Sequence, residues 1–194
     1  MTGVAMPSDK ALLVIDMQND LCQDPRRRRL IDAMLPSLQS AIVQCQEALV
    51  PVIFTQYWLE AGAEQFRRFG DTYCLANTVG AEIIDELRDF VGDGNLVKKT
   101  KHSAFFGTDL DVRLARLGTR TLGLAGLQTH ICIMTTAADA NFRGIRPVAL
   151  SDCVVSSDSL KKDQALAWIA DYVGSVATAN EFLSEVSDDG VLSR

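Results

Sequence analysis

Six short apolar stretches, each continuous and rich in Val, Ile and Leu, constrain the fold of this chain more than any other feature. They cover residues 11–15, 50–54, 95–98, 121–125, 147–151 and 172–177. Strands exposed on one face alternate apolar and polar residues, whereas strands buried on both faces of a parallel sheet read as continuous runs. The sequence therefore predicts six buried strands.

The segments between these runs show helical periodicity. Residues 30–49 and 79–90 each place apolar side chains along one helical face, and Thr129 is a suitable N-cap for a helix that ends at Gly144. Strands alternating with helices predict a doubly wound, Rossmann-like α/β fold: a mostly parallel six-stranded sheet with helices on both faces. The 194 residues contain no repeat, low-complexity tract or linker, which predicts one domain over residues 1–194.

The composition argues against several classes of partner. A formal net charge of -6 and a pI near 4.9 would repel a phosphate backbone, so we expect no nucleic-acid partner. No apolar run approaches the roughly 20 residues of a membrane span, and the first ten residues lack the order of a secretion signal. Five cysteines without CxxC spacing favour free thiols in a reducing compartment. We therefore expect a cytoplasmic protein without a membrane partner.

Common cofactor motifs are missing from the sequence. The first apolar run continues into DMQND, which contains no glycine, and neither GxGxxG nor GxxxxGK[ST] occurs anywhere. His102 and His130, the two histidines, do not form an HExxH-type pair. We expect no cofactor and no metal.

Reactive side chains stand where three of the apolar runs end. Asp16 follows the first run, Lys99 follows the third, and Cys132 lies just past the fourth, in the first turn of the helix expected from Thr129. Ligands of open parallel sheets bind beyond the carboxyl ends of the strands, so these side chains are expected to converge. A helix start stabilises a thiolate, and we expect Cys132 to be partly ionised at neutral pH.

Position alone leaves alternatives for two of these residues. Lys98 and Lys101 crowd the same strand end as Lys99, and a surface lysine cluster is the simplest interpretation of the three. Cys22, close to the end of the first run, competes with Cys132 as the nucleophile.

Two further segments are open to more than one interpretation. Residues 56–77 form a long connection with aromatic side chains, and loops of this length are usually functional, which suggests a lid or an oligomer contact. Residues 26–29 are four consecutive arginines. A solvated helix entry is the main interpretation of this cluster, and an anionic substrate or a subunit contact is the alternative.

Three longer stretches give these residues a common context: ALLVIDMQND, VKKTKHSAFFGTDLDVRL and LAGLQTHICIMTTAADA, followed by VALSDCVVSS. With them the chain resembles the isochorismatase-like cysteine hydrolase family, over about residues 10–180. The family includes nicotinamidases, N-carbamoylsarcosine amidases, and ureidoacrylate and biuret amidohydrolases. The resemblance implies a catalytic triad of Asp16, Lys99 and Cys132. It also implies a cis peptide bond between Leu127 and Gln128, and an oxyanion hole formed by the backbone N–H groups of Gln128 and Cys132.

The sequence departs from the family pattern at several positions. The family usually has Phe at the position of Leu21, Tyr at that of His102 and Arg at that of Ala138. Nicotinamidases carry an Asp-x-His metal motif after the second strand, whereas residues 55–58 read TQYW here. Isochorismatases proper cleave a vinyl ether and need no cysteine, so the retention of Cys132 favours C–N bond hydrolysis.

The resemblance therefore implies a cysteine-dependent amidohydrolase of the N-carbamoylsarcosine, ureidoacrylate and biuret branch. We expect it to cleave a small amide or carbamoyl or ureido compound through a thioester and to release ammonia. The expected pocket walls are Gln18, Trp58, Phe105 and Gln128, and the expected assembly is a homo-oligomer, either a dimer or a tetramer. An isochorismatase-type vinyl ether hydrolase, or a non-catalytic assembly module on the same fold, are the alternatives.

Overall fold

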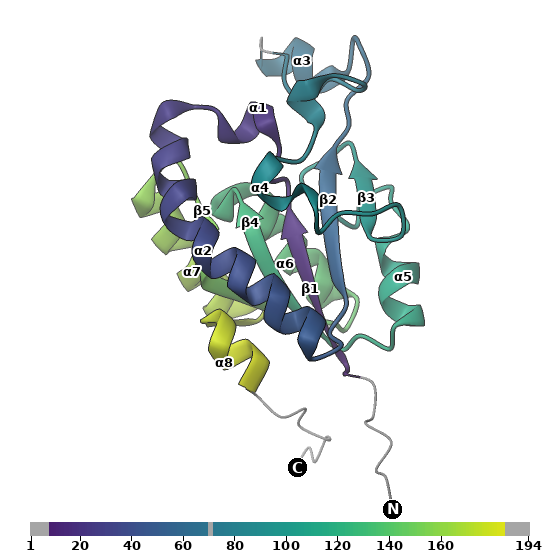
Figure 1. Cartoon of the computed structure of the whole chain (residues 1–194), viewed down its shortest axis with the longest axis vertical. Helices are drawn as coiled ribbons and strands as arrows, with labels where there is room; N and C mark the ends of the chain where they lie inside the picture. The colour runs from purple at the N-terminus through teal and green to yellow at the C-terminus, as the bar shows by residue number, and fades with distance from the viewer. Residues whose placement is uncertain (1–7, 70–71, 185–194) are drawn as a thin grey trace, which may run out of the picture.

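All six strands of the sheet run parallel, in the spatial order β3-β2-β1-β4-β5-β6 (Figure 1). The computed structural model describes residues 8–69 and 72–184. The strands are β1 (Lys10–Ile15), β2 (Val52–Tyr57), β3 (Leu96–Lys99), β4 (Thr121–Leu127), β5 (Arg146–Val155) and β6 (Ser175–Ala177). The chain builds outward from β1 to β3 and then returns to the other side of β1. This confirms the predicted doubly wound sheet and places its topological switch point between β1 and β4.

The strands are continuous apolar runs because helices cover both faces of the sheet. Every residue of β1, β2 and β4 is buried. On one face lie α2 (Pro25–Glu47) and α8 (Ala179–Ser184), as Figure 1 shows. The other face packs against α5 (Leu110–Arg116), α6 (Met134–Phe142) and α7 (Ser159–Tyr172). The described residues thus form one α/β domain with two hydrophobic layers.

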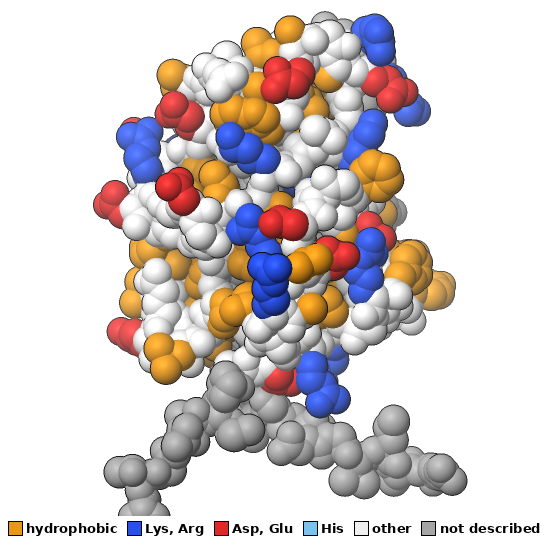
Figure 2. Space-filling model, turned by 90° about the vertical axis from the view of Figure 1, so that its right-hand side faces the viewer, with side chains coloured by type: hydrophobic (Ala, Val, Ile, Leu, Met, Phe, Trp, Pro, Cys, Tyr) orange, Lys and Arg blue, Asp and Glu red, His pale blue; other side chains and the backbone are white. Residues whose placement is uncertain are grey.

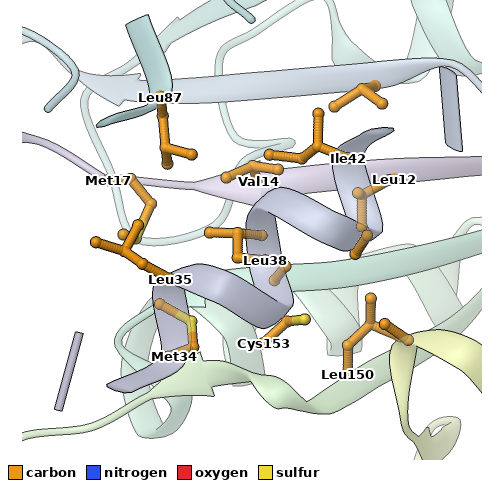
Figure 3. Packing of buried hydrophobic residues seen from close by; sticks show 14 of the residues in the cluster. Leu12, Val14, Met17, Met34, Leu35, Leu38, Ile42, Leu87, Leu150 and Cys153 are labelled. Atoms are coloured by element: carbon orange, nitrogen blue, oxygen red, sulfur yellow. The ribbon is translucent and has the colours of Figure 1, made fainter. Parts of the chain in front are cut away.

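The packing of α2 shows how the alternation of strand side chains divides these layers. Leu12 and Val14 of β1 point toward Leu38 and Ile42 of α2, and all four are fully buried (Figure 3). The intervening Leu13 enters the cluster on the opposite face. Because successive strand residues face opposite sides, a continuous apolar strand contributes to both layers.

The helix predicted over residues 79–90 does not form, and that prediction was wrong. The segment contains a 3-10 turn, η1 (Val79–Ala81), and a short helix, α4 (Asp85–Arg88), on either side of an extended stretch. The extended stretch pairs with the residues after β1: Asn19 N–H donates to the Glu82 carbonyl at 3.0 Å, and Ile84 N–H donates to the Met17 carbonyl at 2.9 Å. Long-range pairing with the chain after β1 therefore overrides the local helical periodicity.

The remaining boundaries differ from the prediction by a few residues. Helix α2 begins at Pro25, a residue suited to a first helical position, and ends at Glu47. The last strand is shorter than its apolar run, because Tyr172 still belongs to α7 and β6 starts at Ser175. The short elements α1 (Asn19–Cys22) and α3 (Glu64–Phe69) complete the fold.

The surface carries charges of both signs. Figure 2 shows one face of the molecule, on which Lys and Arg side chains alternate with Asp and Glu rather than gathering by sign. Among the described residues, no helix has both the length and the apolar character that crossing a bilayer requires.

Gly126 gives a test of the close contact between β1 and β4. It has φ +101, and a Cβ atom at this position would lie 2.2 Å from the Ile15 carbonyl oxygen. We expect Gly126→Ala to lower the free energy of unfolding by about 2–5 kcal/mol, because backbone strain and overpacking add. Urea unfolding followed by circular dichroism measures this loss.

Gly118→Ala is the matched control. Gly118 also has positive φ, at +68, but a Cβ there would meet nothing within 4 Å. We expect it to cost only the backbone term, about 1–2 kcal/mol. Equal losses in the two variants would contradict the proposed contact with Ile15.

Candidate active site

The carboxyl ends of β1, β3 and β4 bring three reactive side chains together. Asp16 directly follows β1, Lys99 is the last residue of β3, and Cys132 lies in a π-helical turn, η2 (Thr129–Ile133), after β4. Lys99 Nζ is 2.7 Å from Asp16 Oδ2 and 3.7 Å from Cys132 Sγ. The three residues singled out at separate strand ends therefore share one contact network.

Asp16 is held by a sharp backbone turn and by the neighbouring strand. Its φ of +54 lies in the left-handed region, which Asp tolerates better than most residues, and it turns the chain away from the sheet. Thr55 of β2 lies beside the end of β1, and its hydroxyl donates to Asp16 Oδ1 at 2.7 Å. Oδ2 lies 2.7 Å from the Lys99 ammonium, and the Asp16 carboxyl group also hydrogen-bonds to the Cys132 thiol, so it is placed to accept a proton from that thiol.

Lys99 is distinguished from its neighbours by burial. Its side chain is completely buried, and Nζ donates to the carbonyls of Lys101 at 3.0 Å and His102 at 3.2 Å. Lys98 Nζ instead lies over the Trp58 ring at 3.5 Å, and Lys101 forms a partly exposed ion pair with Glu64. Only Lys99 therefore reaches Asp16.

β2 lies between β1 and β3, so the Lys99 side chain must cross it to reach Asp16. It does so over Tyr57, whose ring centroid is 3.8 Å from Nζ. A cation over an aromatic face is attracted by the ring quadrupole, and this attraction offsets part of the desolvation of the ammonium.

The thiol of Cys132 is protonated at neutral pH, contrary to the expectation of partial ionisation. Burial raises its pKa to about 12; the Lys99 ammonium lowers this pKa and the Asp16 carboxylate raises it. Desolvation in this enclosed site outweighs the effect of the adjacent helical turn. A nucleophilic attack by this thiol would require a proton acceptor, and the Asp16 carboxyl group is in hydrogen-bond contact with it.

The backbone around the thiol provides N–H groups. The peptide bond between Leu127 and Gln128 is cis, as the resemblance implied. The backbone of Gln128 interacts with the Cys132 sulfur and lowers the pKa of the thiol. The capping residue of the turn is Gln128, one residue before the predicted N-cap Thr129, and Thr129 is buried within the turn.

A cavity of about 320 Å³ opens beside Cys132. Residues from the ends of several strands and from the segments that follow them form its wall: Asp20, Leu21, Arg27, Tyr57, Tyr73, His102, Leu127, Gln128, Ile131 and Cys132. This volume is at the small end of the roughly 300–1,000 Å³ that is usual for ligand pockets. The cavity therefore suits a small molecule.

Of the four expected pocket residues, the structure places one at the cavity wall. Gln128 lines this cavity, but Trp58 and Phe105 do not. Trp58 stacks with Lys98, and Phe105 is buried in the core with the Arg143 guanidinium 4.8 Å above its ring. Tyr57 and Tyr73 supply the aromatic wall instead.

Gln18 also lies outside the cavity wall and acts as a buried clamp. Its Nε2 donates to the carbonyls of Tyr57 and Ala81, at 2.8 and 2.7 Å, and its Oε1 accepts from Tyr57 N–H at 2.8 Å. Gln18 thus fixes the end of β2, and with it the position of the Tyr57 ring.

Two of the three departures from the family pattern line the cavity. Leu21 and His102 are part of its wall, whereas Ala138 is not. His102 Nδ1 is 3.0 Å from the Tyr57 hydroxyl and 4.0 Å from Cys132 Sγ. Burial and then the Lys99 ammonium hold the pKa of His102 below its usual range, so the ring is neutral near pH 7. The departures therefore change the shape and polarity of the wall rather than its charge.

The connection over residues 56–77 contributes directly to the site. Tyr73 lines the cavity, and the Cys74 N–H donates to Asp20 Oδ2 at 2.7 Å. Phe66 contacts Tyr73 edge to face, with ring centroids 6.0 Å apart. The lid or oligomer contact expected for this segment stays a prediction, and the sequence held no signal for which of its residues reach the cavity.

No cluster of three or more His, Cys, Asp or Glu side chains suited to a metal ion occurs within residues 8–69 and 72–184. At the position where nicotinamidases carry their metal motif, Thr55 donates to Asp16 and Gln56 donates to the Ala81 carbonyl at 2.6 Å. These side chains are engaged in structural contacts.

Comparison with known proteins identifies the family of the chain. Residues 10–181 match the Isochorismatase domain family. The chain belongs to this family. It is a family of hydrolases that includes C–N amidases.

Three proteins illustrate the range of its relatives. The secreted isochorismatase effector Isc1 of Verticillium dahliae is 28% identical over 92% of this chain and 93% of its own length. The ureidoacrylate amidohydrolase RutB of Rhizobium rhizogenes is 27% identical over 93% of this chain and 85% of its own. The crystal structure of N-carbamoylsarcosine amidase from Thermoplasma acidophilum superposes with a TM-score of 0.75 and 26% identity, covering 92% of this chain and 98% of the other.

The raised pKa of the Cys132 thiol leads to a testable prediction. With a pKa near 12, its rate of alkylation by iodoacetamide should rise about tenfold per pH unit between pH 6 and 9 without levelling off, because the thiolate is the reactive form. Mass spectrometry of quenched samples measures labelling at each pH.

Cys132 should still be labelled before the other cysteines, because it lines the cavity while Cys22, Cys45, Cys74 and Cys153 are at most 1% exposed. An unstructured peptide with one internal cysteine, whose thiol pKa is near 8.5 and whose rate therefore begins to level off above that pH, is the control. A plateau for Cys132 below pH 8 would show that the thiolate is stabilised after all.

Proposed function

We propose that this protein is a cysteine-dependent amidohydrolase that cleaves the C–N bond of a small amide, carbamoyl or ureido compound and releases ammonia. The observation that supports this most strongly is a thiol at the wall of a small cavity, 3.7 Å from the ammonium of a buried carboxylate–ammonium pair. A thiol, an adjacent proton acceptor and a fixed cation are the groups that nucleophilic acyl transfer requires.

The first half of the proposed reaction forms a thioester. Cys132 Sγ attacks the substrate carbonyl carbon while Asp16 Oδ2 takes the thiol proton, and the carbonyl electron pair moves to oxygen. The backbone N–H groups of Gln128 and Cys132 stabilise this oxyanion. When the oxyanion collapses, the C–N bond breaks, Asp16 returns its proton to the nitrogen, and ammonia leaves.

The second half regenerates the enzyme. Asp16, again a carboxylate, takes a proton from a water molecule as the oxygen of that water attacks the thioester carbonyl. The C–S bond breaks, the proton returns to sulfur, and the acid product leaves. Lys99 keeps its charge throughout and stabilises Asp16 and the developing thiolate by its position 2.7 and 3.7 Å from them.

Vinyl ether hydrolysis of the isochorismatase type is the second candidate. It is favoured by the similarity to the isochorismatase effector over nearly the whole chain. This reaction needs an acid and a water molecule but no thiol, so the dependence of the rate on Cys132 distinguishes the two candidates.

The variants of the three clustered residues test the proposal. With a panel of small amides and ureido acids and ammonia release as the measurement, Cys132→Ala should be inactive. Asp16→Asn should lower turnover on the order of a thousandfold or more, since it removes the proton acceptor of a cooperating set. Lys99→Met should have a comparable effect. Acyl transfer to Cys132 in the wild type should be visible by mass spectrometry under single-turnover conditions.

Lys101→Met is the control for Lys99→Met, because Lys101 is partly exposed and contacts Glu64 rather than Asp16. Breaking the buried pair also destabilises the fold by about 3–5 kcal/mol, so each variant must be shown to be folded under assay conditions. Full activity of Cys132→Ala on a vinyl ether, with no amide cleaved by the wild type, would favour the isochorismatase reaction.

The mechanism makes no use of a metal, which leads to a separate prediction. Prolonged treatment with EDTA should leave ammonia release unchanged, because each proposed step is performed by side chains and backbone groups. The measurement is activity before and after dialysis against chelator. A loss restored by zinc, iron or manganese would contradict this mechanism.

A further inference from the structure

Arg27 is a charged wall of the cavity that the proposed reaction does not use. It is one of the four consecutive arginines at residues 26–29 and lies in the first turn of α2. In this position it lines the same cavity as Cys132. Its Nη1 donates to the Leu21 carbonyl at 2.6 Å, which fixes the direction of the guanidinium. The side chain is half-buried rather than extended into solvent.

Nε of this guanidinium has no hydrogen-bond partner among the described residues. Nε is buried, and Arg27 forms no ion pair with any described carboxylate. The adjacent Arg28 is different, because it pairs with both Asp32 and Glu86. A buried, unpartnered donor is unfavourable in the unliganded protein, and the Nε–Nη2 edge of arginine matches the two oxygens of a carboxylate.

The charges around the cavity leave Arg27 available for an anion. The Lys99 ammonium is neutralised by Asp16, and His102 is neutral. Asp20 is the other charged residue of the wall; it accepts from the Cys74 N–H, and its carboxyl group packs against Gly80. Arg27 and Asp20 do not form an ion pair, so the Arg27 charge is not cancelled by direct contact.

We infer that Arg27 is a specificity-determining residue that binds a carboxylate of the substrate through its Nε–Nη2 edge. The substrate class is then a small amido or ureido acid, with the scissile carbonyl at Cys132 and the carboxylate at Arg27 in the same cavity. This inference rests on the proposed function for the reaction, but the anion site itself does not depend on it.

Matched substrate pairs test the inference. N-carbamoylglycine and N-ethylurea differ by a carboxylate in place of a methyl group, as do succinamate and butanamide. In Arg27→Gln, the ratio of kcat/KM for the acid to kcat/KM for its neutral partner should fall about ten- to a hundredfold, because a bidentate charged contact is lost. The loss should appear mainly in KM, since the contact is made before the reaction and throughout it.

Two further variants separate charge, geometry and surface effects. Arg27→Lys keeps the charge without the two-pronged edge, and its ratio should lie between those of the wild type and Arg27→Gln. Arg29→Gln is the matched control, because Arg29 is an exposed neighbour on the same helix that does not line the cavity. An equal fall for acid and neutral substrates in Arg27→Gln, or no fall in either, would overturn the inference.

A binding measurement keeps this test independent of turnover. Succinamate should slow the alkylation of Cys132 by iodoacetamide in the wild type and in Arg29→Gln, and butanamide should protect less. Arg27→Gln should lose the protection by succinamate. If no amide is hydrolysed but this pattern holds, the proposed reaction fails and the Arg27 site stands. If amides are hydrolysed but protection does not depend on Arg27, the site is disproved and the reaction stands.

Discussion

The buried ion pair between Lys99 and Asp16 is the interaction on which the rest of the site depends. Both side chains are completely removed from solvent, and the desolvation of two such charges costs several kcal/mol each unless other contacts compensate. The compensation is visible: a hydroxyl donates to Asp16, two backbone carbonyls accept from Lys99, and an aromatic ring lies below the ammonium. The pair joins the ends of β1 and β3 across the end of β2 and so fixes three strand ends relative to one another.

This pair also sets the electrostatic state of the thiol. An isolated ammonium beside Cys132 would favour the thiolate, but here the Asp16 carboxylate opposes the ammonium and burial dominates both. The proton therefore resides on sulfur, next to the Asp16 carboxyl group. In the proposed mechanism the thiol is activated only when it attacks substrate, and this would also protect it from adventitious oxidation, which acts on thiolates.

The topology of the sheet explains why the cavity lies where it does. β1 and β4 are neighbours at the switch point, so the connections that follow them leave toward opposite faces and open a crevice between them. The residues after β1 then form α1 and α2, which bring Leu21 and Arg27 to the wall, and the residues after β4 form the turn with Cys132. The connection after β2 adds Tyr73 and holds Asp20 through Cys74. Segments distant in the sequence thus meet around one small volume.

Most of the residues that form the pocket wall could not be predicted from the sequence. Tyr57 and Trp58 are adjacent aromatic residues, and Trp58 is the one expected at the pocket wall, whereas Tyr57 lines the cavity and Trp58 lies against the Lys98 ammonium. Nothing in the local sequence distinguishes the two positions. The clamp formed by Gln18 on the Tyr57 backbone is a long-range contact that no local pattern reports.

The sequence by itself determined the strands, the parallel sheet and the place of Asp16, Lys99 and Cys132 at strand ends, because hydrophobic periodicity records which segments are buried. The resemblance to a family selected Lys99 from its neighbours, and the structure shows the burial behind that selection. Only the tertiary structure decided that residues 79–90 do not form one helix, that the thiol is protonated, and that Arg27 reaches the cavity. Each of these depends on contacts between segments far apart in the chain, and desolvation and long-range pairing are properties of the folded molecule rather than of any local stretch of sequence.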